Sequence, residues 1–195
     1  MLNKLSKGIV DWQIQRKYLS NEERELYVYA YEVLINQVIN IIAAILIAIL
    51  MHAIIPVFVF LVCYIPLRSY CGGYHAKTNI GCTCISALVI YFMCLLEKTI
   101  AVKIEKFWLI IGFLAAGLII FILAPVQDNN KPLDFAELMQ YRKTSRLIWL
   151  IESILGCILG IWFHNIIFVI VLSQLILSIM LCIGLIKNKK KHEAN

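Results

Sequence analysis

A short polar segment, residues 68–84, lies between two almost purely apolar runs and is rich in thiols and glycine. It holds His75 and, seven positions later, Cys82, a pair that can act as general base and nucleophile in acyl transfer. If residues 75–82 formed one helix, the two side chains would be separated by about 10.5 Å of rise, too far for a hydrogen bond. A dyad therefore requires the chain to fold back, with Cys82 near the start of the next helix, whose positive end favours a thiolate.

Glycines make such a bend sterically easy, and the segment has three of them, Gly72, Gly73 and Gly81. Spacing alone leaves two other interpretations open. The first is a zinc or copper site, because four soft ligands are available in Cys71, His75, Cys82 and Cys84, although their intervals are not those of common zinc ligand pairs. The second is an inert loop.

The elements that must position this segment are membrane helices. Of 195 residues, 62% are hydrophobic and 15% are charged, more apolar than a soluble domain of this length. A bilayer core takes about 20 helical residues, so the second and third apolar runs span it only with flanking residues or as re-entrant segments. We expect an all-α integral membrane protein of about six transmembrane or re-entrant helices, at Tyr31–His52, Ala53–Leu67, Ile85–Leu96, Phe107–Ala124, Leu147–Phe163 and Ile166–Ile186.

The lysines and arginines predict the orientation. They cluster before the first run, after the second and fourth, and in the tail from Lys187 to Lys191, so both termini and the 68–84 loop are expected in the cytoplasm. The external connections are then a turn at His52, residues 97–106, and the turn formed by His164 and Asn165. We interpret the net charge of +6 as directed to anionic lipid headgroups and not to nucleic acid.

The N-terminal 19 residues predict an amphipathic helix that lies at the membrane surface, within a single membrane domain covering residues 1–195. Packing against the protein's own cytoplasmic loops is the alternative. The apolar stripe consists of Leu2, Leu5, Ile9 and Trp12, while Val10 and Ile14 fall off it. Two helix starts are also predicted, one by a capping box of Ser20 with Glu23 and one by Asp134 with Glu137.

Two polar residues lie within the later apolar runs. Glu152 is a functional candidate because ionisable groups are costly in a membrane, and Arg68 or Arg146 is a possible partner for it. Solvation of Glu152 near the interface is the alternative. Gln174 is expected to hydrogen-bond across helices or at a dimer contact. Asp128 lies on the same side as His75 in this topology, although nothing in the sequence places the two close together.

The order Arg68-x3-Gly72-Gly73-x-His75-x6-Cys82 between membrane spans resembles the accessory gene regulator B (AgrB) family. The likeness extends to the length, the basic amphipathic N-terminus and the loop Ala124–Leu133. It implies a multi-pass cysteine endopeptidase of the cell membrane, working without cofactor or metal, that processes an AgrD-type precursor peptide in quorum sensing. By position, His75 would be the general base and Cys82 the nucleophile, and the arginine and the glycine pair would be needed for activity. A homodimer is also implied.

The mechanism implied by this resemblance is acyl transfer. The thiolate of Cys82 attacks a carbonyl near the C-terminal region of the precursor, the C-terminal tail leaves, and a thioester remains on the enzyme. A thiol or hydroxyl of the retained fragment then closes a thiolactone or lactone ring. The rival interpretations are a small transporter or exporter, a metal-binding membrane protein, and a scaffold without catalytic activity.

Overall fold

The computed structural model describes residues 2–74, 76, 78–127 and 134–192, the last three of them as backbone alone. Within these residues the chain is helical and has no strand, which confirms the all-α expectation. The elements are α1 (Leu2–Gln15), the 3₁₀-helix η1 (Asn21–Glu23), α2 (Arg24–Leu50), α3 (Ile54–Cys71), α4 (Asn79–Ile100), α5 (Lys106–Leu123), α6 (Phe135–Leu159) and α7 (His164–His192).

Each of the six apolar runs lies largely within one helix, from α2 to α7 in order. Five of these helices are long and apolar enough to cross a bilayer, namely α2 with η1, α3, α4, α5 and α7. In α6 the apolar stretch fills only the second half, because the first half carries charged residues such as Arg142 and Arg146. The two short runs, in α3 and α4, do gain the flanking residues that a span requires.

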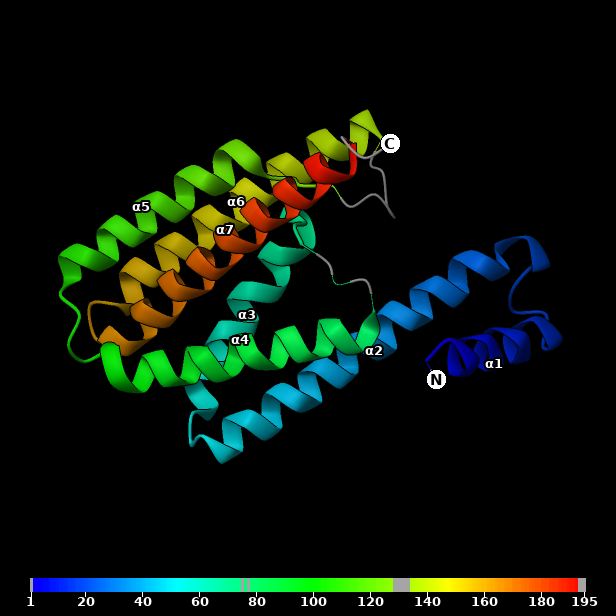
Figure 1. Cartoon of the computed structure of the whole chain (residues 1–195), viewed down its shortest axis with the longest axis horizontal. Coiled ribbons are helices and arrows are strands. Elements are labelled where there is room, and N and C mark those ends of the chain that lie inside the picture. The colour runs from blue at the N-terminus through cyan, green and yellow to red at the C-terminus, as the bar shows by residue number, and fades with distance from the viewer. Residues whose placement is uncertain (1, 75, 77, 128–133, 193–195) are drawn as a thin grey trace.

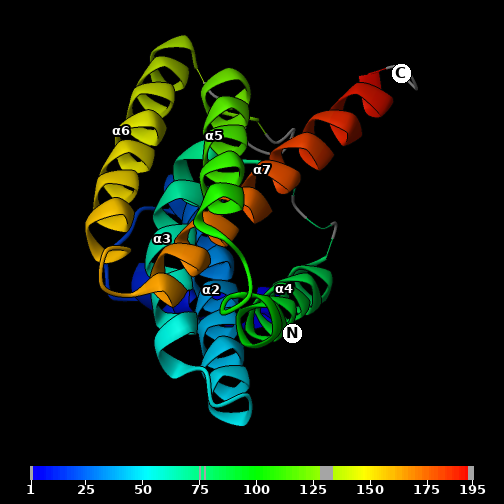
Figure 2. The same ribbon diagram turned by 90° about the vertical axis from the view of Figure 1, so that its left-hand side faces the viewer.

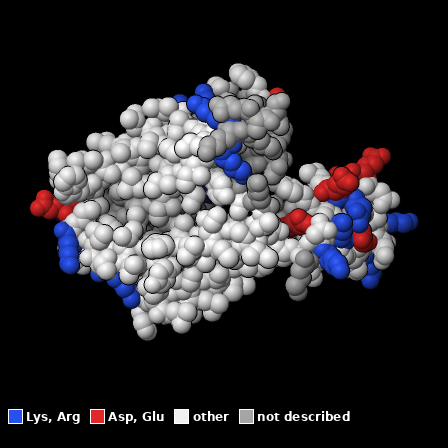
Figure 3. Space-filling view, in the orientation of Figure 1, with Lys and Arg blue, Asp and Glu red and all other residues white. Residues whose placement is uncertain are grey.

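The helices α3 and α7 form the centre of the molecule. They pack on each other, with α2 and α4 on one side and α5 and α6 on the other (Figures 1 and 2). Half of the most apolar stretch of α7 is buried within the protein, more than in any other of the five candidate spans. The outer helices expose apolar side chains, and in the face shown in Figure 3 a belt without charge separates charged ends. Such a belt fits the hydrocarbon region of a bilayer.

The connections between helices gather at two opposite ends, as the alternating topology requires (Figure 1). At one end the Asn165 amide donates to Glu97 Oε1 at 3.1 Å, and both residues line a cavity with His52. These residues belong to the three connections expected outside the cell. At the other end the Val126 N–H donates to the Cys71 carbonyl at 2.9 Å, which joins two connections expected in the cytoplasm.

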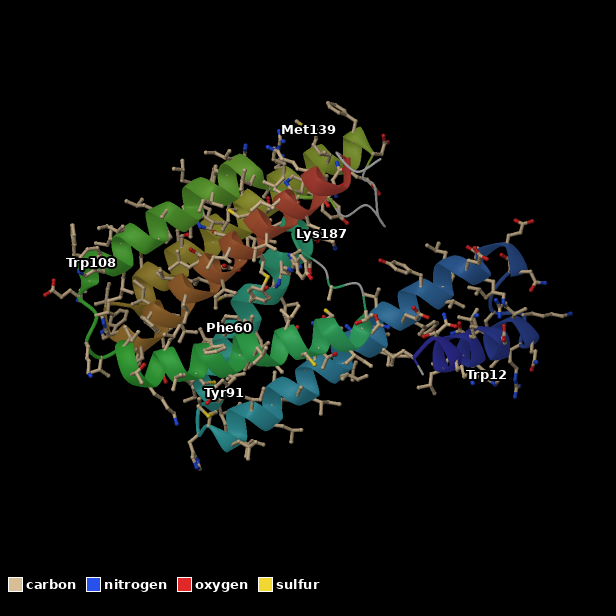
Figure 4. The ribbon with its side chains drawn as sticks, in the orientation of Figure 1. Trp12, Phe60, Tyr91, Trp108, Met139 and Lys187 are labelled. Carbon is tan, nitrogen blue, oxygen red and sulfur yellow. The ribbon has the colours of Figure 1, made fainter. Side chains whose placement is uncertain are left out.

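The N-terminal helix α1 packs on the protein and also exposes an apolar face that could lie at the membrane surface, so it combines the two expected alternatives. It packs on α2 through Ser6 and Val10, which are fully buried, so Val10 is a contact residue although it falls off the apolar stripe. Leu5 and Trp12 of that stripe are 50% and 53% exposed, and Figure 4 shows Trp12 on the side of α1 away from α2. Asp11 pairs with Arg24 of α2 at 2.8 Å. The stripe is therefore left available to the membrane surface.

One of the two predicted capping boxes is present. At the start of α6, the Asp134 side chain caps the helix and the Asp134 N–H donates to Glu137 Oε2 at 3.2 Å. The box at Ser20 is wrong, because a 3₁₀ turn precedes α2 and the Ser20 hydroxyl makes no bond to its backbone. That hydroxyl instead donates to the Glu23 carboxylate at 2.9 Å.

Candidate active site

Cys82 lies in the first turn and a half of α4, as the sequence predicted for a nucleophile. Thr78 is the N-cap, and its hydroxyl accepts a hydrogen bond from the Gly81 N–H at 3.1 Å. The Cys82 N–H donates to the Thr78 carbonyl at 3.0 Å. Because α4 begins at Asn79, residues 75–82 are not one helix, and the separation of about 10.5 Å expected for a continuous helix does not apply.

The three thiols of the segment differ in access. Cys71, the last residue of α3, is fully buried, Cys82 is half-buried, and Cys84 is exposed. Cys82 and Cys84 lie two residues apart on α4 and so point to different sides of the helix. An attacking thiol must reach substrate and yet be shielded from water, which Cys82 fits best.

The glycine pair passes through a space too narrow for side chains. Gly72 and Gly73 have φ values of 69° and 113°, which L side chains rarely adopt. A Cβ on Gly72 would collide with the carbonyl oxygen of Val126, and one on Gly73 with the guanidinium of Arg68. The Gly73 N–H donates to that Val126 carbonyl at 3.2 Å. Both glycines are therefore required by the local geometry.

Arg68 clamps the same segment from the last turn of α3. Its Nη1 donates to the Gly72 carbonyl and its Nη2 to the Tyr74 carbonyl. The planar guanidinium presents several donors in a fixed fork, which allows one side chain to hold two carbonyls two residues apart. Tyr74 directly precedes His75 in the sequence, so the clamp fixes the backbone that leads to the predicted general base.

The predicted site residues His75 and Asp128 lie outside the described residues. The proximity of His75 to Cys82 therefore stays a prediction, as does the assignment of Asp128 to the same side of the membrane. Among the described residues, no cluster of three or more histidine, cysteine or acidic side chains could hold a metal ion.

Glu152 is buried at 8% exposure in α6, next to Gln174 of α7. Neither of the arginines considered as partners pairs with it, because Arg68 binds carbonyls and Arg146 donates to the Phe121 carbonyl at 2.8 Å. Both oxygens of Glu152 lack a hydrogen-bond partner among the described residues. Solvation of the carboxylate at the interface is also contradicted by its burial. Glu152 is close enough to Cys71 to interact electrostatically.

Three polar residues, one at the N-cap of α4 and two on α2, were not singled out from the sequence. Thr78 had the signal of an N-cap, a Thr before an apolar run. The other two are amides within the first span. Asn36 accepts a hydrogen bond from the Thr83 hydroxyl at 3.4 Å, and Asn40 has a buried, unpartnered Oδ1 among the described residues. Amides inside an apolar run were the available signal for both.

The N–H groups of Gly81 and Cys82 both donate to Thr78, the first to its hydroxyl and the second to its carbonyl. The N–H groups of Asn79 and Ile80 precede the first intrahelical bond of α4. They are therefore the two backbone donors at this position for which the helix itself provides no acceptor.

In a comparison with known families, the family model described as "Accessory gene regulator B" matches residues 3–182 of the chain. The chain belongs to the AgrB family. Two AgrB-like proteins of Clostridium perfringens, from strain SM101 / Type A and strain 13 / Type A, are 29% and 26% identical to it over 168 residues. Each alignment covers 82% of this chain and 78% of the relative. No solved structure matches the chain significantly.

As an AgrB protein, the chain is a membrane protein of the agr quorum-sensing system. The AgrB family acts in autoinducer processing, which implies an AgrD-type precursor as partner.

Proposed function

We propose that this AgrB protein is a membrane cysteine endopeptidase that removes the C-terminal tail of an AgrD-type precursor and allows the remaining fragment to cyclise. One observation carries the proposal. Cys82, half-buried at the capped start of α4, follows a backbone segment that Arg68 and the Val126 loop hold in place up to Tyr74. The general base assigned by the family pattern, His75, is the next residue.

The residues have distinct roles in the proposed reaction. His75 takes the proton of the Cys82 thiol, and the thiolate attacks the scissile carbonyl of the precursor. The C–N bond breaks, His75 returns the proton to the departing amine, and the N-terminal fragment remains as a thioester on Cys82. A thiol or hydroxyl of that fragment then attacks the thioester, forms the thiolactone or lactone, and releases Cys82 as the thiol.

The surroundings of Cys82 favour acyl transfer over hydrolysis. The thiol is half-buried and its helix packs on α2 through the Thr83–Asn36 contact, which limits the approach of water from that side. The partial positive charge at the start of α4 stabilises negative charge in the same turn. The left-over amides of Asn79 and Ile80 are the proposed donors to the oxyanion.

The test uses co-expressed precursor and three variants. Cys82→Ser and His75→Ala are expected to abolish cleavage, whereas Cys84→Ser, a matched change two residues away, retains it. Mass spectrometry of the intact wild-type protein should show an adduct of the N-terminal fragment that hydroxylamine removes. Continued cleavage by both Cys82→Ser and His75→Ala would contradict the peptidase assignment and favour a transporter or a scaffold.

The homodimer and the cytoplasmic location of the termini and of the 68–84 loop remain part of this proposal. The dimer is checked by the mass of the protein in detergent, measured by light scattering.

A further inference from the structure

Tyr74 is held by the described residues at three points. Its N–H donates to the Met180 carbonyl at 3.0 Å, and its own carbonyl accepts from Arg68. The ammonium of Lys187 lies 4.9 Å from the centroid of its ring, within the range of a cation–π interaction. Two of these three contacts come from α7, and Figure 4 shows Lys187 at the end of the bundle where α3 ends. The last helix therefore forms one wall of the segment that leads to His75.

The approach of α7 to this segment is a contact of backbone with backbone. A Cβ on Gly184 would lie 2.8 Å from the Tyr74 nitrogen and 2.9 Å from the Gly73 carbonyl carbon, and real Cβ atoms do not come so close. From the other side, a Cβ on Gly73 would lie 3.1 Å from the Met180 carbonyl oxygen. Neither group that Gly184 would meet is a flexible side chain. Any residue larger than glycine at position 184 must push the segment away from α7.

The C-terminal part of α7 also binds a second loop, which follows α5 and contains Val126 and Gln127. The Asn188 side chain donates to the Gln127 carbonyl at 2.8 Å, one residue after Val126, which bonds to Cys71 and Gly73. The two loops and α7 thus form one hydrogen-bonded unit, within which Gly184 permits the close approach of α7 to the backbone of Gly73 and Tyr74.

We propose that Gly184 is a positioning residue, and that Met180–Asn188 of α7 is the template that sets the backbone before the general base. A displacement of Tyr74 is transmitted to His75 because adjacent Cα atoms are fixed about 3.8 Å apart. This inference rests on the proposed function, since it assigns His75 as the base. A misplacement of about 1 Å costs on the order of a hundredfold in rate.

The central variant is Gly184→Ala, with Gly156→Ala of α6 as the matched control. A Cβ on Gly156 would meet only the Ile170 side chain, at an ordinary 3.4 Å. For Gly184→Ala we expect kcat for precursor cleavage to fall about 10- to 100-fold with KM within about twofold of wild type. The control is expected to keep both constants. An unchanged kcat, or a loss confined to KM, overturns the inference.

A second readout separates positioning from general destabilisation. The rate at which iodoacetamide alkylates Cys82 is measured against pH by mass spectrometry of the Cys82 peptide. Gly184→Ala should move this profile in the direction of the His75→Ala profile, while Gly156→Ala leaves it unchanged. A wild-type profile in a folded Gly184→Ala variant contradicts the inference.

If Gly184→Ala does not fold, the cation–π contact provides the test. Lys187→Arg keeps a cation over the Tyr74 ring and should retain kcat, whereas Lys187→Met should lower kcat about twofold to fivefold. Equal activity of the two variants contradicts the template.

Cleavage that survives Cys82→Ser and His75→Ala refutes the proposed function itself. If both abolish cleavage while Gly184→Ala keeps wild-type kcat and profile, only the inference on Gly184 fails.

Discussion

Replacement of Gly72 by alanine is the most direct test of how the site is built. Gly72 has φ 69° and ψ −143°, close to a region that only glycine adopts, so alanine adds backbone strain of about 1–3 kcal/mol. Its Cβ would also collide with the Val126 carbonyl oxygen. Relief of that collision breaks the two bonds of Val126 to Cys71 and Gly73, worth about 0.5–1.5 kcal/mol each.

Together these costs amount to about 2–6 kcal/mol against the arrangement that leads to His75. Since about 1.36 kcal/mol corresponds to a factor of ten, we expect Gly72→Ala to form the Cys82 thioester at least about 30-fold more slowly. The assay is single-turnover acyl-enzyme formation in proteoliposomes with the precursor peptide. Gly8→Ala in α1 is the control, because a Cβ there has nothing within 4 Å. A Gly72→Ala rate within twofold of wild type would refute this account.

Three further predictions concern the clamp, the cap and the topology. Arg68→Lys keeps the charge, but a lysine cannot hold both carbonyls as the guanidinium fork does. We expect the loss of one charge-assisted hydrogen bond, worth about 1.5–3 kcal/mol. The rate of thioester formation should then fall roughly tenfold or more. Thr78→Ala should destabilise the first turn of α4 by about 1 kcal/mol and slow thioester formation. Thr78→Ser retains the acceptor for the Gly81 N–H and should not slow it. The check is a direct comparison of the rates of thioester formation by the two variants. A membrane-impermeant maleimide should label Lys103→Cys in intact cells but Cys84 only after permeabilisation, and the reverse pattern would invert the topology.

The helices were predictable because their signal is local. Each apolar run is long, and the glycine, proline and charged residues between the runs mark where helices stop, so six expected segments match α2 to α7. The placement of Cys82 early in α4 followed from the same pattern, since an apolar run begins directly after it. These features depend on residues that are neighbours in the sequence, so one sequence is enough to predict them.

The details that were wrong or missed depend on tertiary contacts. Val10 falls off the apolar stripe of α1 yet is buried, because α2 packs on the other face. The backbone bridge between Gly72 and Val126 explains the glycine pair. It joins residues far apart in the sequence, so no local pattern predicts it. The burial of Glu152 without either expected arginine depends on how α6 and α7 pack, which likewise has no local signal.

The hydrogen bond from Tyr74 to Met180 has a consequence for biosynthesis. A membrane protein is made from its N-terminus, so α3 and α4 are complete long before α7 leaves the ribosome. Until α7 arrives, the segment before His75 lacks the partner of its Tyr74 amide and the wall that Gly184 provides. Under the proposed mechanism, the nascent chain therefore carries Cys82 without a finished site, and we expect competence to react only once the final span is in place.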